Sequence, residues 1–181
     1  MMAMHPDIQE KIHQEILTVV TKNDANISYA DLGKLTFMEM CLKETMRLFP
    51  VLPFIARHSS EEVQLEDNII PKGVTVVMPI FNIQRDKKSW GEDAGEFNPD
   101  RFSPENISKV HTHSYIPFGG GPRICIGMKY AMMNMKTVLA HFHLKYRVST
   151  SIKYESLTYK LAISLKICQK YLMKIEKRNY Q

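Results

Sequence analysis

The chain has 181 residues, of which 44% are hydrophobic and 24% charged, with eight glycines and nine prolines. These fractions are typical of a globular chain of about one domain, and they exclude a disordered, collagen-like or low-complexity protein. Lysine and arginine exceed aspartate and glutamate by 24 to 19, a net charge of +5, but no run of basic residues indicates a nucleic-acid partner.

Three cysteines stand far apart in the sequence, at positions 41, 125 and 168. An odd number without a C-x-x-C pair favours neither a disulfide framework nor a cysteine-rich zinc site, so we expect a reducing compartment. No stretch approaches the ~18 to 20 apolar residues of a membrane span, and the first residues carry a proline and charges where a signal peptide has its apolar core. The sequence therefore predicts neither a membrane span nor a secretory leader.

The first predicted element is an amphipathic helix from Pro6 to about Lys22, followed by a turn at residues 23–26. Proline suits the first turn of a helix. Charged residues separate apolar ones that recur near helical spacing, and these are Ile8, Ile12, Ile16 and Val19.

A second helix is predicted over about residues 35–48, and Pro50 ends it. Ser28 with Asp31 three residues later resembles a helix-start box before it. Cys41 lies on the apolar side of this helix and is expected in the core. The apolar stripe consists of Leu35, Met38, Leu42 and Phe49.

Prolines interrupt residues 51–117, so short strands and loops are predicted there. Residues 63–65 and 74–78 resemble two strands of a hairpin-rich sheet, joined by the turn at residues 71–73.

Beyond Pro122 a third helix is predicted, with one apolar side that we expect to pack in the core. Residues 157–167 alternate between apolar and polar and predict one strand with a covered apolar face, with Cys168 in the core near it. Residues 170–181 are expected to fray as a solvated end. The apolar side of the third helix consists of Met128, Ala131 or Met132, Met135, Val138 or Leu139, and Phe142.

The segment with the clearest chemistry is residues 118–127, F-G-G-G-P-R-I-C-I-G, directly before the third helix. Cys125 thus lies at a helix N-terminus, where unpaired N–H groups and the helix dipole favour a negatively charged, metal-binding sulfur. One thiolate without a second protein ligand nearby suits an iron already held by a macrocycle. Glycines let the backbone approach a flat cofactor closely, and Arg123 offers a fork of donors to a carboxylate such as a haem propionate.

This segment resembles the cysteine loop of the cytochrome P450 family, the haem-thiolate monooxygenases. The resemblance implies haem b as the cofactor, with Cys125 as the catalytic residue and the axial thiolate ligand of the iron. The family pattern F-x-x-G-x-R-x-C-x-G is matched at every fixed position, and these cofactor-binding candidates are Phe118, Gly121, Arg123, Cys125 and Gly127.

Two further motifs precede the cysteine loop in the chain, in the same order as in the family. Glu44 and Arg47 match its E-x-x-R helix, where the spacing puts both charges on one face and lets them pair away from solvent. Residues 97–102, F-N-P-D-R-F, resemble its P-x-R-F motif, whose arginine, here Arg101, joins the Glu–Arg pair. The resemblance implies that these three residues form a structural triad without a direct chemical role.

Two positions in the middle segment bear on the cofactor. Arg57 stands where many relatives have a second arginine near a haem propionate, so it is a cofactor-binding candidate, although an ordinary surface arginine fits nearly as well. Relatives commonly carry histidine where this chain has Gln84, and no propionate contact is assigned to that position.

The resemblance implies a fold class that is mainly α with small β-sheets (α+β), as the proximal haem-binding half of the cytochrome P450 fold. The chain is expected to be one C-terminal segment, residues 1–181, of a truncated family member that lacks the helix over the distal haem face and the membrane anchor. Its expected parts are two helices in residues 5–50, small strands and a meander in 51–117, the cysteine loop in 118–127, a helix in 128–145, and a strand hairpin and tail in 146–181.

For function, the resemblance implies a microsomal-type monooxygenase that inserts one oxygen atom from O2 into a small lipophilic substrate. Cys125 would donate electron density to the haem iron. An NADPH-dependent flavoprotein reductase would supply electrons from the cysteine-side face, where Lys129 is a basic candidate for docking. The implied location is the cytosolic face of the endoplasmic reticulum membrane.

Rival interpretations start from the same residues. The chain could be a non-catalytic remnant that binds haem or the reductase. The pairs His111 with His113 and His141 with His143 do not predict zinc, because the first has no third ligand nearby and helical residues two apart face opposite ways. The triple glycine lacks the Lys-Ser/Thr pair of a phosphate loop.

Overall fold

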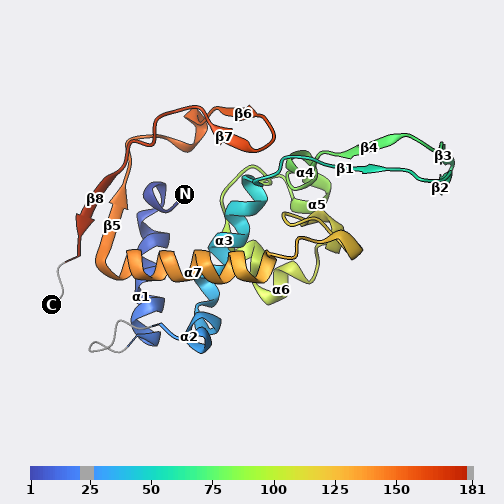
Figure 1. Ribbon diagram of the computed structural model, residues 1–181. Helices are drawn as coiled ribbons and strands as arrows, with labels where there is room; N and C mark the ends of the chain where they lie inside the picture. The colour runs from blue at the N-terminus through green and yellow to red at the C-terminus, as the bar shows by residue number, and fades with distance from the viewer. Residues whose placement is uncertain (21–26, 179–181) are drawn as a thin grey trace.

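The computed structural model describes residues 1–20 and 27–178. Helices α1, α3 and α7 form the body, α7 crosses α1, and β-hairpins project from this body (Figure 1). The predicted turn at 23–26 and the predicted helix end at Lys22 lie outside the described residues. The helices are α1 (Pro6–Val19), α2 (Tyr29–Lys34), α3 (Thr36–Leu48), α4 (Ile80–Ile83), α5 (Lys87–Trp90), α6 (Pro104–Ile107) and α7 (Met128–Lys145), with 3-10 turns at Met2–Met4, Pro99–Phe102, Thr112–Ser114, Gly121–Arg123 and Tyr154–Ser156.

The strands form two-stranded antiparallel sheets in which β1 pairs with β4, β2 with β3, β5 with β8, and β6 with β7. Together with the helices they confirm the predicted fold class, mainly α with small β-sheets. The strands are β1 (Ile55–His58), β2 (Val63–Leu65), β3 (Asn68–Ile70), β4 (Thr75–Met78), β5 (Tyr146–Ser149), β6 (Tyr159–Leu161), β7 (Leu165–Ile167) and β8 (Lys174–Lys177).

The main core lies where α1, α2, α3 and α7 meet. Burial of these aliphatic side chains is the largest favourable contribution to folding. Cys41 is 2% exposed, as predicted. A second, smaller cluster of Trp90, Ala94 and Phe102 lies in the meander that follows α4. The buried members of the main core are Ile12, Ile16, Leu32, Leu35, Met38, Cys41, Leu42, Ala140 and Leu144.

The chain before α3 differs from the prediction of a single second helix. Ser28 and Asp31 do form a capping box, but it begins the short helix α2. Leu35, with φ −78° and ψ 70°, separates α2 from α3. The Glu15 carboxylate of α1 accepts the Phe37 N–H at 2.6 Å, and it thereby satisfies one of the unpaired donors at the start of α3.

The predicted pairing of residues 63–65 with 74–78 is wrong. β2 pairs with β3, and β4 pairs with β1 in a register that places Arg57 opposite Val76. The inner pair is nested inside the outer pair, so the four strands form one projecting arm (Figure 1). An apolar strand pattern predicts that a segment is extended, but it does not determine which other strand the segment pairs with.

The predicted single strand over residues 157–167 is a hairpin. β6 and β7 pair with each other in a register that places Leu161 opposite Leu165. Folding back gives both strands hydrogen-bonded partners that a lone strand would lack. The hairpin lies on the surface, where Ile163 is 87% exposed. Cys168 is exposed as well, so its predicted place in the core is wrong.

The prediction that residues 170–181 fray is wrong for residues 174–177, because they form β8, which pairs with β5. The side chains of β8 are exposed, as predicted. The Arg178 N–H donates to the Lys145 C=O at 2.8 Å, and the Arg178 guanidinium forms an ion pair with Glu10 of α1 at 2.7 Å. The end of the described chain is therefore attached to both α7 and α1. Residues 179–181 lie outside the described residues.

α7 has the predicted bounds but a different buried face. Met132, Met135 and Leu139 of the predicted side are partly buried against the edge of the core, whereas Val138, the alternative to Leu139, is 59% exposed. The core therefore contacts a face that is rotated away from the predicted methionine side. In the described residues, no helix has the length and apolar character needed to cross a bilayer. The buried positions of α7 are Lys136, Ala140, His143 and Leu144.

Candidate functional site

The cysteine loop, residues 118–127, is closed by its own backbone. The Cys125 N–H donates to the Phe118 C=O, and the Gly119 N–H donates to the Ile116 C=O, both at 2.9 Å. The Met128 N–H then donates to the Cys125 C=O at 3.3 Å, where α7 begins. These bonds hold Cys125 at the N-terminal end of α7.

Glycines in the loop occupy positions that other residues would disturb. Gly119 and Gly121 have φ of 77° and 70°, in the left-handed region where a side chain causes strain. A Cβ on Gly127 would lie 3.8 Å from the Cys125 Sγ. A side chain at position 127 would therefore begin at van der Waals contact with the sulfur.

The surroundings of Cys125 are apolar and accessible. Cys125 is an exposed free thiol, and its neighbours Ile124 and Ile126 are 45% and 103% exposed. The exposed Arg123 guanidinium has no hydrogen-bond or ion-pair partner among the described residues. A thiol, an apolar rim and an unpaired cation in one loop fit a haem, which needs a soft axial ligand, a flat apolar contact and a partner for its propionates.

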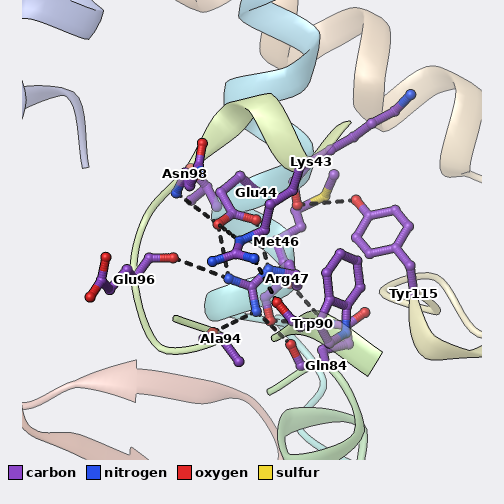
Figure 2. Close-up of polar contacts among 12 residues, drawn as sticks. Lys43, Glu44, Met46, Arg47, Gln84, Trp90, Ala94, Glu96, Asn98 and Tyr115 are labelled. Atoms are coloured by element: carbon purple, nitrogen blue, oxygen red, sulfur yellow. Dashed lines mark hydrogen bonds and ion pairs between the residues drawn. The ribbon is translucent and has the colours of Figure 1, made fainter. Parts of the chain in front are cut away.

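Glu44 and Arg47 lie on one face of α3, and both side chains are fully buried (Figure 2). Arg47 donates to the Glu44 carboxylate from Nε at 2.7 Å and from Nη2 at 2.9 Å. The Arg101 Nε lies 3.5 Å from the same carboxylate, and the Asn98 N–H donates to it at 2.9 Å. The structure therefore brings the three residues of the expected triad together.

The remaining donors of Arg47 bind the meander. Its Nη atoms donate to the carbonyls of Gln84, Ala94 and Glu96 at 2.8, 2.7 and 3.2 Å (Figure 2). The guanidinium carbon also lies 4.9 Å from the centre of the Trp90 ring, within the range of a cation–π contact. One buried side chain thus joins α3 to three points of the segment that leads to the cysteine loop.

Arg101 links the meander to the same cluster. It donates to the carbonyls of Trp90 and Asp93, each at 2.6 Å, and its Nη2 forms an ion pair with the Asp93 carboxylate at 2.5 Å. The hydrogen bond and charge of Arg101 hold the pKa of Asp93 below its usual value. Arg101 therefore reaches Glu44 on one side and the chain after α5 on the other.

Gln84, to which the sequence assigned no role, is fully buried in this cluster. Its side-chain amide donates to the carbonyls of Met46 and Arg47 and accepts the Ile116 N–H. These partners lie 32 to 38 residues away along the chain. A lone glutamine carries no sequence signal for such distant contacts.

Arg57 is not brought into contact with the loop. It is an exposed residue of β1, and its Nη1 donates to the adjacent Ala56 carbonyl at 2.9 Å. Its side chain forms no hydrogen bond or ion pair with the cysteine loop in the part of the chain that the structure describes.

The histidine pairs lie in different surroundings from each other. His143 is buried in α7, whereas His141 is exposed, and the rings of His111 and His113 are 5.4 Å apart. Among residues 1–20 and 27–178, no three His, Cys, Asp or Glu side chains are grouped so that they could hold a metal ion.

A groove of about 570 Å³ lies beside the cysteine loop, between α2, α3 and the start of α7. Phe118 and Lys129 contribute to its lining. Glu39 of α3 forms an ion pair with Lys43 on the same helix, and another across the groove with Lys136 of α7. Lys129 is exposed and has no ion-pair partner among the described residues, so it adds an uncompensated positive charge next to the loop.

A model of the cytochrome P450 family matches residues 1–171. The chain is similar to the Drosophila melanogaster proteins named "Probable cytochrome P450 313a4" and "Cytochrome P450 4p1", at 38% identity over 180 residues and 36% over 178 residues. Each match covers 98% of this chain but only 36% and 34% of the relative. The chain therefore belongs to the cytochrome P450 family, and it spans about a third of the length of these relatives.

Proposed function

We propose that the chain supplies the thiolate-ligand side of a haem-dependent monooxygenase. The observation that carries the proposal is the exposed free thiol of Cys125 at the N-terminal end of α7, in a closed glycine loop beside an unpaired Arg123. The enzyme would insert one oxygen atom from O2 into a small lipophilic substrate. The chain belongs to the cytochrome P450 family, and its two other motifs, around Glu44 and Arg101, meet in a cluster of buried ion pairs.

The residues of the loop have separate roles in this proposal. The Cys125 Sγ would be the axial ligand of haem b, and the N-terminal end of α7 would stabilise its negative charge. Phe118, Gly121 and Gly127 would contact the macrocycle, and Arg123 would pair with a propionate. When bound, the haem would supply the reductive activation of O2.

Arg57 would provide a second propionate partner. Its guanidinium is exposed and its one hydrogen bond is to an adjacent carbonyl, so a change of side-chain rotamer would free the whole fork. The triad of Glu44, Arg47 and Arg101 would act as a scaffold, because its charges are turned inward and bonded to one another and to backbone carbonyls.

Electrons would come from an NADPH-dependent flavoprotein reductase that docks beside the cysteine loop. The lysines that line the groove next to Phe118, with Lys129 unpaired among the described residues, suit an acidic partner surface. By family, the proposed location is the cytosolic face of the endoplasmic reticulum membrane.

A second candidate is a haem-binding or reductase-binding protein without turnover. The outward face of α7 favours it, since Tyr130 and Val138 are 66% and 59% exposed. Exposed apolar side chains on a helix next to the loop are typical of a surface that another segment or partner covers. In that case the loop would still bind haem, while oxygen transfer would be absent.

The test is the absorption spectrum of the 181-residue chain, loaded with haem, reduced and exposed to carbon monoxide. We expect a strongly red-shifted Soret band in the parent and in Cys168→Ala, which removes the other exposed thiol, but not in Cys125→Ala. A folded chain without this band would overturn the haem assignment. A band without oxygen transfer in the presence of a reductase would support the second candidate.

A further inference from the structure

Gln84 joins α3 to Ile116, which lies two residues before the cysteine loop. Among the described residues, no other glutamine or asparagine side chain makes this connection. Gln84 follows α4 and is 0% exposed. Its Nε2 donates to the Met46 and Arg47 carbonyls, each at 3.0 Å, and its Oε1 accepts the Ile116 N–H at 3.0 Å. All three bonds connect elements that are distant in sequence.

On the side of α3, the carbonyls of Met46 and Arg47 need a hydrogen-bond donor. Met46 and Arg47 lie in the last turn of α3, whose carbonyls have no partner within the helix. Pro50 follows closely and cannot donate a backbone N–H. The two hydrogens of the Gln84 amide therefore satisfy carbonyls that would otherwise be buried without a partner.

On the side of the cysteine loop, the backbone N–H of Ile116 needs a hydrogen-bond acceptor. Ile116 uses its N–H for Gln84 and its C=O for the Gly119 N–H at 2.9 Å. Gly119 follows Phe118, whose own C=O accepts the Cys125 N–H at 2.9 Å. A short series of backbone bonds thus runs from Ile116 to the residue that carries the sulfur.

We infer that Gln84 is a positioning residue of the cysteine loop: its amide fixes Ile116, and through Ile116 the Cys125 sulfur, relative to the C-terminal end of α3. The inference rests on the proposed function only in one respect, namely that the positioned sulfur serves as a haem ligand. The contact itself exists in the chain without haem and is tested there.

Methionine at position 84 provides the sharpest variant, because it keeps the length of the side chain and removes both the donors and the acceptor. Hydrogen exchange of the haem-free 181-residue chain should show that Gln84→Met speeds exchange of the Gly119 and Cys125 amides about tenfold. Neither amide bonds to Gln84, so the effect reports the position of the loop and not the lost bond.

Gln9 offers a matched control. It is also buried, and its side-chain amide donates to the Met2 and Val148 carbonyls and accepts the Val148 N–H. Gln9→Met therefore removes the same number of bonds far from the loop. We expect it to speed exchange at Val148 and to leave Gly119 and Cys125 unchanged; equal acceleration of the loop amides by both variants would overturn the inference.

Gln84→His tests the chemistry of the contact. A neutral imidazole provides one acceptor and one donor, so it can keep the Ile116 bond and one carbonyl. Exchange at Gly119 and Cys125 should then stay within about threefold of the parent. After haem loading, the red-shifted carbon monoxide band should persist in Gln84→His and Gln9→Met and be reduced in Gln84→Met. Exchange in Gln84→His as fast as in Gln84→Met would contradict the role of the Ile116 bond.

A measurement on the parent chain covers the case in which Gln84→Met does not fold. If one anchor holds the loop, the amides of Ile116, Gly119 and Cys125 should open together, with the same urea dependence of exchange. Separate opening of Ile116 would show that the loop keeps its place without Gln84. A missing haem band together with joint opening of these amides would overturn the proposed function and leave the positioning intact.

Discussion

Arg47 and Glu44 form a buried ion pair in which the guanidinium donates two hydrogen bonds to the carboxylate, at 2.7 and 2.9 Å, with neither side chain exposed. The other polar atoms of the pair are also bonded, to backbone carbonyls of the meander and to the Asn98 N–H. A buried pair is favourable only with such complete bonding, because two charges have left water.

Glu44→Gln should therefore lower the free energy of unfolding by about 3 to 5 kcal/mol, since it leaves the Arg47 charge buried without its partner. Urea unfolding followed by circular dichroism measures the change. Glu92→Gln is the control, because it breaks an exposed pair with Lys87 that is worth about 0 to 1 kcal/mol. Similar losses in the two variants would show that burial does not set the strength of the Glu44 pair.

The sequence predicted this pair because both residues lie within one helix turn, where spacing determines which face they share. It could not predict the Glu15 carboxylate at the start of α3, since Glu15 lies 22 residues before Phe37. The same limit applies to the strands. Alternation in residues 157–167 indicated extended chain, but only the tertiary structure determines that β6 pairs with β7.

The cysteine loop was predictable for a related reason. Its glycines, Arg123 and Cys125 are consecutive or nearly so, and the helix after them follows from local pattern. The role of Gln84 could not be predicted, because it depends on contacts with α3 and Ile116 that no local pattern encodes. Residues that act within one turn or loop are visible in the sequence, whereas residues that join distant segments become visible only in the structure.

The three cysteines should differ in reactivity. Burial raises the pKa of the Cys41 thiol to about 12, whereas Cys125 and Cys168 are exposed. At pH 8, iodoacetamide should label Cys125 and Cys168 in the native chain and Cys41 only after unfolding, as mass spectrometry of the peptides would show. Haem should then protect Cys125 and leave Cys168 reactive; equal labelling of Cys125 with and without haem would count against ligation by its sulfur.

Arg123→Leu should weaken haem binding about 10- to 100-fold, because a hydrogen bond to a charged group contributes about 1.5 to 3 kcal/mol. Titration of the 181-residue chain with haem, followed by the Soret absorbance, gives the dissociation constant. Arg147→Leu is the matched control, as this arginine lies in β5 and is exposed. If both variants bind haem like the parent, Arg123 has no propionate partner.

His143 should make the stability of the chain depend on pH. Burial, together with the charges of Arg178 and His13, lowers the pKa of His143 to about 4, from an ordinary value of 6.5. Between these two values the unfolded chain binds a proton that the native chain does not, so stability is complete above about pH 6.5 and falls as the pH is lowered toward 4.

The loss from this group amounts to about 3 kcal/mol over that interval. Urea unfolding at pH 7.5, 6 and 5 would measure it, with His143→Leu and His141→Leu as a pair. Leucine at the buried position cannot take up a proton, so this variant should flatten the fall in stability between pH 6.5 and 4, apart from the parts due to His5 and His13, whose pKa values are also lowered by burial. His141 is exposed, and its replacement should leave the slope as it is in the parent. The same slope in all three chains would mean that His143 titrates alike in the folded and unfolded states, and that its burial in α7 does not keep it neutral.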